Sequence, residues 1–178
     1  MRGLKPRLIA VDGIDAAPVL AAAKRVLASR ARGGISHWDA SGLFQELAVA
    51  GPAAGAPCPR TLLLLYAADL AFRLRWEIRP KLAEGYTVVA APYVETAVAF
   101  GRATGVSAAW LANLFRFAPR ANEYRFVHQS RARIKSGVDG FVGFSCEVVE
   151  GRPAGRTRKQ ILAGAAKELR AIARRRRR

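Results

Sequence analysis

Short apolar runs alternate along this chain with longer segments whose apolar positions recur every three or four residues. The short runs predict buried strands, and the longer segments predict helices with one apolar face. Strands are predicted at residues 7–11, 35–38, 86–91, 124–128 and 141–149. Helices are predicted at residues 17–31, 42–49, 59–82, 96–102 and 107–117, and after a capping-box pattern at Thr157 and Gln160. This alternation is typical of an α/β domain with a mainly parallel sheet.

Glycine and proline mark the predicted boundaries between these elements. Gly33-Gly34 is expected to end the first helix, and the composition of residues 50–57 predicts a flexible surface loop. Pro80 is expected to bend or end the long helix. In parallel sheets ligands bind beyond the carboxyl ends of the strands, so we expect any site among the segments that follow them. These segments are residues 12–17, 37–41 and 91–95 and the chain from His128 onward.

The composition indicates one folded domain without a membrane segment. The chain has 178 residues, of which 51% are hydrophobic, enough for one sizeable core. No apolar stretch approaches the roughly 18 residues of a membrane span, and the first apolar run is too short for a signal peptide. We therefore expect a cytoplasmic protein. The two cysteines, Cys58 and Cys146, form neither a disulfide framework nor a zinc pattern, so no metal site is predicted.

Positive charge dominates the chain and increases toward its end. Thirty lysines and arginines face 13 acidic residues, for a net charge of +17, and five arginines end the sequence. We expect residues 1–173 to form the single domain and residues 174–178 a polyarginine tail. Such a segment attracts nucleic acid or another polyanion, and a solubilising or frayed helix end is the ordinary alternative. The candidate polyanion contacts are Arg156, Arg158, Lys159, Arg170, Arg174, Arg175, Arg176, Arg177 and Arg178.

The loop after the first strand has the position of a phosphate-binding loop without its chemistry. A loop of the form G-x-x-x-x-G-K-[ST] needs a second glycine, a lysine and a hydroxyl. Counted from Gly13, these places hold Pro18, Val19 and Leu20. Proline lacks an amide donor, and valine and leucine offer neither charge nor oxygen. We therefore expect no cofactor here, neither ATP nor Mg²⁺.

Several segments, in order, resemble the thymidylate kinase family. They are Val11-Asp12-Gly13-Ile14-Asp15 and residues 59–69, 78–85, 88–89, 110–114 and 117–120. The resemblance spans about residues 7–128. It implies a P-loop NTPase-like fold, with three layers in which helices flank a mainly parallel central sheet.

The departures from the family fall on its functional positions. Ala91-Pro92 stands where the family has Asp-Arg, Leu70 replaces an arginine that helps to read the base, and Gly101 replaces a glutamine. The positions that the resemblance assigns to nucleotide binding, here degenerate, are Gly13, Pro18, Val19, Leu20, Leu70, Tyr93, Phe100 and Arg102. Tyr93 and Phe100 either line the acceptor pocket or pack in the core. Arg131 and Arg133 are the nearest counterparts of the lid arginines.

Three carboxylates remain as candidate catalytic groups, namely Asp12, Asp15 and Glu95, although such residues more often serve as caps and in turns. The leading hypothesis is a relative of the thymidylate kinases that has lost phosphoryl transfer and binds an anionic partner, either nucleic acid or protein. The alternative is a divergent, active dTMP kinase that uses ATP and Mg²⁺. A third hypothesis is a structural subunit that forms a homodimer through the helix at 59–82.

Overall fold

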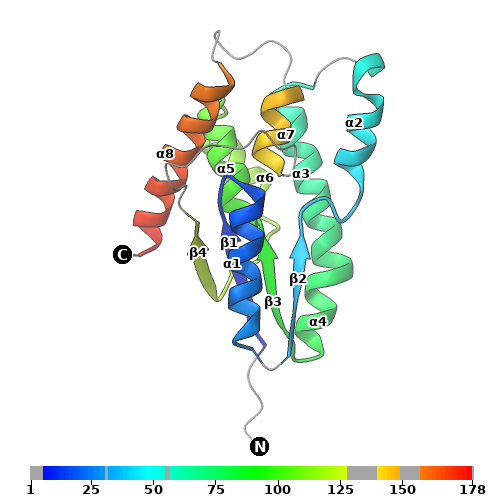
Figure 1. The fold of residues 1–178 in the computed structure, drawn as a ribbon, viewed down its shortest axis with the longest axis vertical. Coiled ribbons are helices and arrows are strands. Elements are labelled where there is room, and N and C mark those ends of the chain that lie inside the picture. Colours follow the sequence, from blue (N-terminus) through cyan, green and yellow to red (C-terminus); the bar gives the residue numbers. More distant parts are fainter. Residues whose placement is uncertain (1–5, 31, 55–56, 128–139, 149–156, 178) are drawn as a thin grey trace, which may run out of the picture.

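The computed structural model describes residues 6–30, 32–54, 57–127, 140–148 and 157–177. Strands and helices alternate along most of this length (Figure 1). The elements are β1 (Leu8–Asp12), α1 (Ala16–Ala28), β2 (Gly33–His37), α2 (Leu43–Ala54), α3 (Pro59–Arg73), η1 (Leu74–Ile78), α4 (Arg79–Ala83), β3 (Thr87–Ala91), α5 (Val94–Ala103), α6 (Ala108–Leu114), β4 (Glu123–Phe126), α7 (Phe141–Val148) and α8 (Arg158–Arg176).

The four strands form one parallel sheet in the order β2-β3-β1-β4. Ile9 of β1 is in register with Val89 of β3 on one side and with Glu123 of β4 on the other. Because every pair is parallel, the carboxyl ends of all four strands lie at the same edge of the sheet. The predicted α/β class, with a mainly parallel sheet between helices, is confirmed.

Alternate residues of the central strands divide the core into two layers. Ile9 and Val11 of β1 pack with Val19, Ala23 and Val26 of α1 on one face. The neighbouring positions, such as Leu8 and Ala10, join the larger cluster built with the helices of the other face. Burial of each large aliphatic side chain stabilises the fold by about 1.5–3 kcal/mol. A central strand such as β1 is therefore covered on both faces. All five of its residues are buried, and the four before Asp12 are apolar.

The segment at 141–149 was predicted to be a strand, and this prediction is wrong. Phe141–Val148 forms helix α7, in which Phe141, Val142, Phe144 and Ser145 are buried. A short apolar run suits a buried helix as well as a buried strand, because its periodicity cannot separate the two. Cys146 is buried as expected, but on this helix, and burial raises the pKa of its thiol to about 11.

Two boundaries also differ from the prediction. Helix α2 continues through Ala54, so residues 50–54 are not a loop, although Gly51-Pro52 disfavours a helix. Strand β2 already includes Gly33, where a Cβ would lie 2.7 Å from the carbonyl oxygen of Thr87. Gly33 thus permits a close approach of two strands and does not end the first helix.

The long helix predicted at 59–82 is interrupted before Pro80. Its regular part stops at Arg73 and gives way to the π-helical turn η1, and α4 then begins with Arg79-Pro80 and runs to Ala83, so Pro80 does not end the helical segment. The predicted capping box starts α8, since the Thr157 hydroxyl accepts a hydrogen bond from the Gln160 amide and the Gln160 side chain accepts one from the Thr157 amide. Helix α8 runs to Arg176, so the arginine run begins inside a helix. The proposed division of the chain at residue 173 stays a prediction.

Candidate functional site

Asp12 ends β1 and is completely buried beneath the start of α5. Its Oδ1 accepts hydrogen bonds from the Tyr93 amide at 2.9 Å and from the amide and hydroxyl of Thr96 at 3.0 and 2.8 Å. Its Oδ2 has no hydrogen-bond partner among the described residues. Burial, followed by the charge of Glu95, raises the Asp12 pKa to about 6, although the bonds from Thr96 and Tyr93 lower it. The carboxyl ties two segments of the sheet edge together and does not face solvent.

The loop that follows is filled by its own side chains. The Gly13 amide donates to the Thr96 hydroxyl at 3.2 Å, so it is already committed to a protein partner. A Cβ on Gly13 would lie only 2.5 Å from Cγ2 of Val19, which is buried against the loop. Val19 therefore occupies the space above Gly13, whereas Pro18 is exposed and Leu20 is half-buried.

Where a phosphate would rest in a working loop, the structure leaves a hollow of only 10 Å³. This is room for about one water molecule. The start of α7 helps to close it, since a Cβ on Gly140 would lie 2.9 Å from the Cβ of Ala16 and 3.4 Å from its amide nitrogen. The hollow is lined by Gly13, Ile14, Ala16, Val19, His37, Trp38, Ala91, Pro92, Thr96, Gly140 and Phe141.

A wider depression of 510 Å³ lies outside the first turn of α1. Its lining residues are Ala16, Ala17, Leu20, His37, Trp38 and Asp39. They include no lysine or arginine, and the one carboxylate among them disfavours an anion. This depression does not replace the missing phosphate site.

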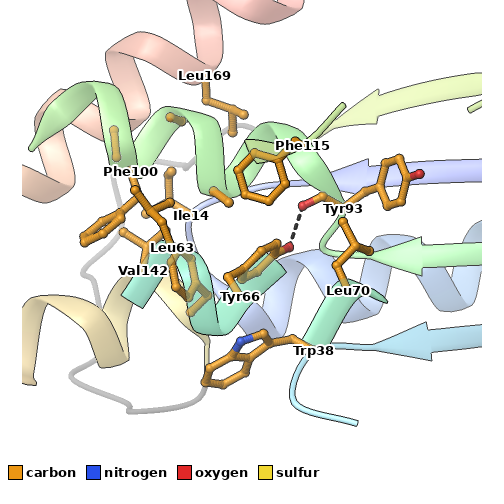
Figure 2. Close-up of a cluster of buried hydrophobic side chains, with 14 of the residues drawn as sticks. Ile14, Trp38, Leu63, Tyr66, Leu70, Tyr93, Phe100, Phe115, Val142 and Leu169 are labelled. Carbon is orange, nitrogen blue, oxygen red and sulfur yellow. Dashed lines mark hydrogen bonds between the residues drawn. The ribbon is translucent and has the colours of Figure 1, made fainter. Parts of the chain in front are cut away.

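The positions that the resemblance assigned to the acceptor pocket belong to the core (Figure 2). The Phe141 ring lies between Tyr66 and Phe100, with ring centroids 4.5 and 5.2 Å away. The Tyr66 hydroxyl donates to the carbonyl oxygen of Tyr93 at 2.5 Å. Leu70, Tyr93 and Phe100 are all buried. Of the two interpretations left open for Tyr93 and Phe100, packing is the one that the contacts support.

The remaining candidates do not gather around this hollow. Arg102 lies on the other side of α5, where its Nε is 4.0 Å from a carboxylate oxygen of Glu168 in α8. Asp15 is the N-cap residue of α1 and is half-buried. Glu95 is buried and forms an ion pair with Arg176. Of the residues that the sequence analysis singled out, the structure brings Asp12, Gly13 and Val19 together. It places Arg102, Asp15 and Glu95 elsewhere.

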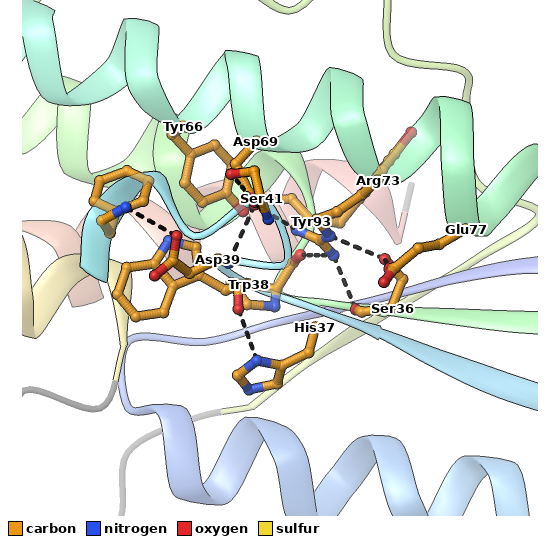
Figure 3. A network of polar contacts seen from close by, with 12 residues as sticks. Ser36, His37, Trp38, Asp39, Ser41, Tyr66, Asp69, Arg73, Glu77 and Tyr93 are labelled. Atoms are coloured by element: carbon orange, nitrogen blue, oxygen red, sulfur yellow. Dashed lines mark hydrogen bonds and ion pairs between the residues drawn. The ribbon is translucent and has the colours of Figure 1, made fainter. Parts of the chain in front are cut away.

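Sequence reasoning missed a buried polar network centred on Arg73 (Figure 3). This fully buried guanidinium donates to the hydroxyl and carbonyl oxygens of Ser36 and to the carbonyl oxygen of Pro92, each at 2.9 Å. Its Nη1 lies 3.8 Å from Asp69, whose carboxylate accepts from the amide and hydroxyl of Ser41. The network fastens the ends of β2 and β3 to α3. The sequence feature that could have indicated this network is the spacing of Asp69 and Arg73, which are four residues apart on the apolar side of α3.

The basic C-terminal helix divides into engaged and exposed arginines. Arg176 donates through Nε to Glu95 at 3.1 Å, and its guanidinium lies 4.3 Å from the centre of the Tyr124 ring. Arg158 forms an ion pair with Glu147 at 3.0 Å. Arg176 is itself exposed, and the other exposed members of the candidate set are Lys159, Arg170, Arg174, Arg175 and Arg177. Arg156 and Arg178, like the lid candidates Arg131 and Arg133, lie outside the described residues.

In sequence, 116 residues are 35% identical to a probable thymidylate kinase of Pyrobaculum calidifontis, a match that covers 63% of this chain and 58% of that protein. Over this part, the chain is similar in sequence to thymidylate kinases. A probable thymidylate kinase of Pyrobaculum aerophilum is 33% identical over 78 residues, which are 44% of this chain and 39% of that protein. The chain thus matches three fifths or less of the length of these curated relatives. No family model matches it.

The fold supports the same relationship. A crystal structure of thymidylate kinase from Ehrlichia chaffeensis matches with a TM-score of 0.66, over 95% of this chain and 83% of that one, at 11% identity. The resemblance to the thymidylate kinases and the P-loop NTPase-like fold that it implied are therefore confirmed. In the part of the chain that the structure describes, none of the helices is both long and apolar enough to cross a membrane.

Proposed function

We propose that this relative of the thymidylate kinases does not transfer phosphoryl groups and acts by binding an anionic partner through its basic surface. The observation that carries the first half is the 10 Å³ hollow above Gly13, which cannot hold a phosphate. Catalysis of phosphoryl transfer depends on positioning and on charge stabilisation by lysine, arginine and metal. Among the described residues that line this hollow, none is a lysine or an arginine.

The second half is supported by the charge and by where it is exposed. The chain carries a net charge of +17. Exposed arginines and two exposed lysines, Lys159 and Lys167, continue along α8 and its C-cap from Lys159 to Arg177. Lysine and arginine side chains that contact phosphates release condensed counterions, which gives strong binding at low salt and weak binding at high salt. A polyanion, with nucleic acid as the favoured kind, is therefore the partner that this surface suits.

ATP-dependent phosphorylation of dTMP tests the first half. The purified protein is assayed against a control without enzyme, with the Pyrobaculum calidifontis relative as a reference, and calorimetry measures ATP binding. We expect no turnover above the control and no saturable ATP binding. Turnover, or ATP binding that a Gly13→Val or Arg102→Gln variant abolishes, would establish the alternative, a divergent dTMP kinase that uses ATP and Mg²⁺.

Fluorescence anisotropy tests the second half. A labelled oligonucleotide is titrated with the protein over roughly 50 to 200 mM KCl. We expect binding whose affinity falls steeply as salt rises. Absence of binding to nucleic acid at the lowest salt would contradict this part of the proposal, whatever the result of the kinase assay.

A further inference from the structure

Because of helical periodicity, the arginines near the end of the chain project from different sides of α8. Ala173 of α8 is buried and Ile172 packs partly against the core. Arg176 and Arg177 lie four residues after them, so they continue the inward-facing side of the helix. Arg174 lies four residues after the exposed Arg170, on the outward-facing side. The uniform run in the sequence is thus two sets of side chains.

The inward set meets strand β4 at the edge of the sheet, where the last turn of α8 lies beside β4 (Figure 1). A hollow of 370 Å³ lies between the two elements, within the range of small-ligand sites of about 300–1,000 Å³. We call it the β4–α8 groove, and it is lined by Glu123, Tyr124, Arg125, Phe126, Arg176 and Arg177.

The charge of the β4–α8 groove favours an anion. Three arginines line it and face a single carboxylate, that of Glu123. This carboxylate is shared by two cations, since it lies 2.6 Å from Arg125 and 3.6 Å from Arg30. The ion pair with Glu95 and the ring of Tyr124 hold Arg176 in place, so one guanidinium is positioned before any partner arrives.

The strand supplies aromatic side chains between the charges. Tyr124 and Phe126 are two residues apart on β4 and are both partly exposed, with the exposed Arg125 between them. Alternation along a strand places the two rings on one face, toward the helix layer with which they pack, and Arg125 on the other, so the β4–α8 groove reaches Arg125 across the edge of the sheet at β4. Rings beside arginines are the combination on which bases of single-stranded nucleic acid stack while their phosphates are neutralised.

We propose that the β4–α8 groove binds single-stranded nucleic acid, with Arg125 and Arg177 on its phosphates and a base against Phe126. This inference rests on the proposed binding of a polyanion and names its site and class. A single strand fits better than a duplex, because the bases of a duplex are stacked on each other and cannot reach the rings. Arg176 positions the groove from the side of α8.

The test compares two variants with the same change of charge. Arg125→Gln/Arg177→Gln removes cations from the groove, and Arg170→Gln/Arg174→Gln removes two from the outward side of α8. Anisotropy is measured with a labelled oligothymidylate of about 12 nucleotides and with a duplex of the same length. We expect the groove variant to bind the single strand about tenfold more weakly, with a salt slope lower by about 1.4, and the outward variant to lose less than about twofold.

A third variant, Phe126→Leu, separates stacking from charge. It is expected to weaken binding several-fold without changing the salt slope, and thermal unfolding checks that it remains folded. If the two double variants lose affinity for the single strand equally, or if the duplex binds more tightly than the single strand, the groove is not the binding site. The proposal that the protein binds a polyanion would still stand. If the unmodified protein binds neither oligonucleotide, the proposed binding function itself fails.

Discussion

Replacement of Asp12 by asparagine should stabilise the protein at neutral and alkaline pH. The carboxyl of Asp12 is fully buried and its Oδ2 lacks a hydrogen-bond partner among the described residues. Asparagine keeps an oxygen that can accept the bonds from Tyr93 and Thr96, and it cannot ionise. The variant therefore removes the cost of a buried negative charge and leaves the tie between β1 and α5 in place.

The magnitude follows from the pKa of Asp12, which burial raises from 3.8 to about 6. The unfolded chain releases the proton more readily than the folded one. The free energy of unfolding is therefore undiminished below about pH 4 and falls as the pH rises to about 6 and beyond. A difference of about two pKa units corresponds to about 3 kcal/mol. An unpartnered amide in place of Oδ2 costs about 1 kcal/mol at every pH, so we expect a net gain of about 2 kcal/mol near pH 8.

Urea unfolding near pH 4 and pH 8 measures this effect. The stability of Asp12→Asn relative to the parent should rise by about 3 kcal/mol between the two conditions. The control is Glu46→Gln, which makes the same kind of change at an exposed carboxylate of α2. If Asp12→Asn behaves like this control, or is less stable than the parent near pH 8, the carboxyl is not held in the way described.

Three other perturbations test separate features of the molecule. Arg73→Met should destabilise the fold by about 3–5 kcal/mol in urea unfolding, because it leaves buried carbonyl oxygens and Asp69 without their cation, and adding Asp69→Asn should recover part of the loss. In native protein a thiol reagent should modify Cys58 quickly, since it is exposed and its pKa is lowered by hydrogen bonds from Thr61, whereas the buried Cys146 should react only after unfolding. Light scattering should give twice 19.3 kDa if the helix at 59–82 forms a homodimer, and Trp76→Glu, at a side chain that is 64% exposed, should then give monomers; an unchanged dimer would exclude this face.

The layout of the fold could be predicted wherever one physical requirement decided the local sequence. Residues 8–11 and 88–91 are apolar throughout, because central strands of a parallel sheet are covered on both faces. Thr157 and Gln160 satisfied the exposed amides at the start of α8, which fixed that helix to the residue. The departures in the phosphate loop were also visible, since glycine, lysine and hydroxyl have no substitutes of similar chemistry.

The rest depended on contacts between distant segments. The position of Phe141 depends on its contacts with the rings of Tyr66 and Phe100. The local sequence of residues 141–148 does not distinguish a helix from a strand. Arg73 would be expected at the surface, and its burial depends on the backbone oxygens of Ser36 and Pro92, the Ser36 hydroxyl and the Asp69 carboxylate. Arg102 was assigned by position in the family pattern, but its side chain lies on the face of α5 toward α8.

Positions that depart from the family's phosphate-binding pattern contribute to the core. Val19 and Leu70 are 2% and 0% exposed, whereas a lysine or arginine that grips a ligand must keep its charge in a polar site. A lysine at position 19 would replace a valine that packs in the apolar cluster between β1 and α1, so its amine would have to be accommodated in a buried apolar layer. The change would cost stability before it restored any affinity for phosphate. Packing thus occupies the positions where the family pattern would place phosphate-binding groups, and the proposed function therefore assigns recognition of an anion to the positive charge of α8 and β4.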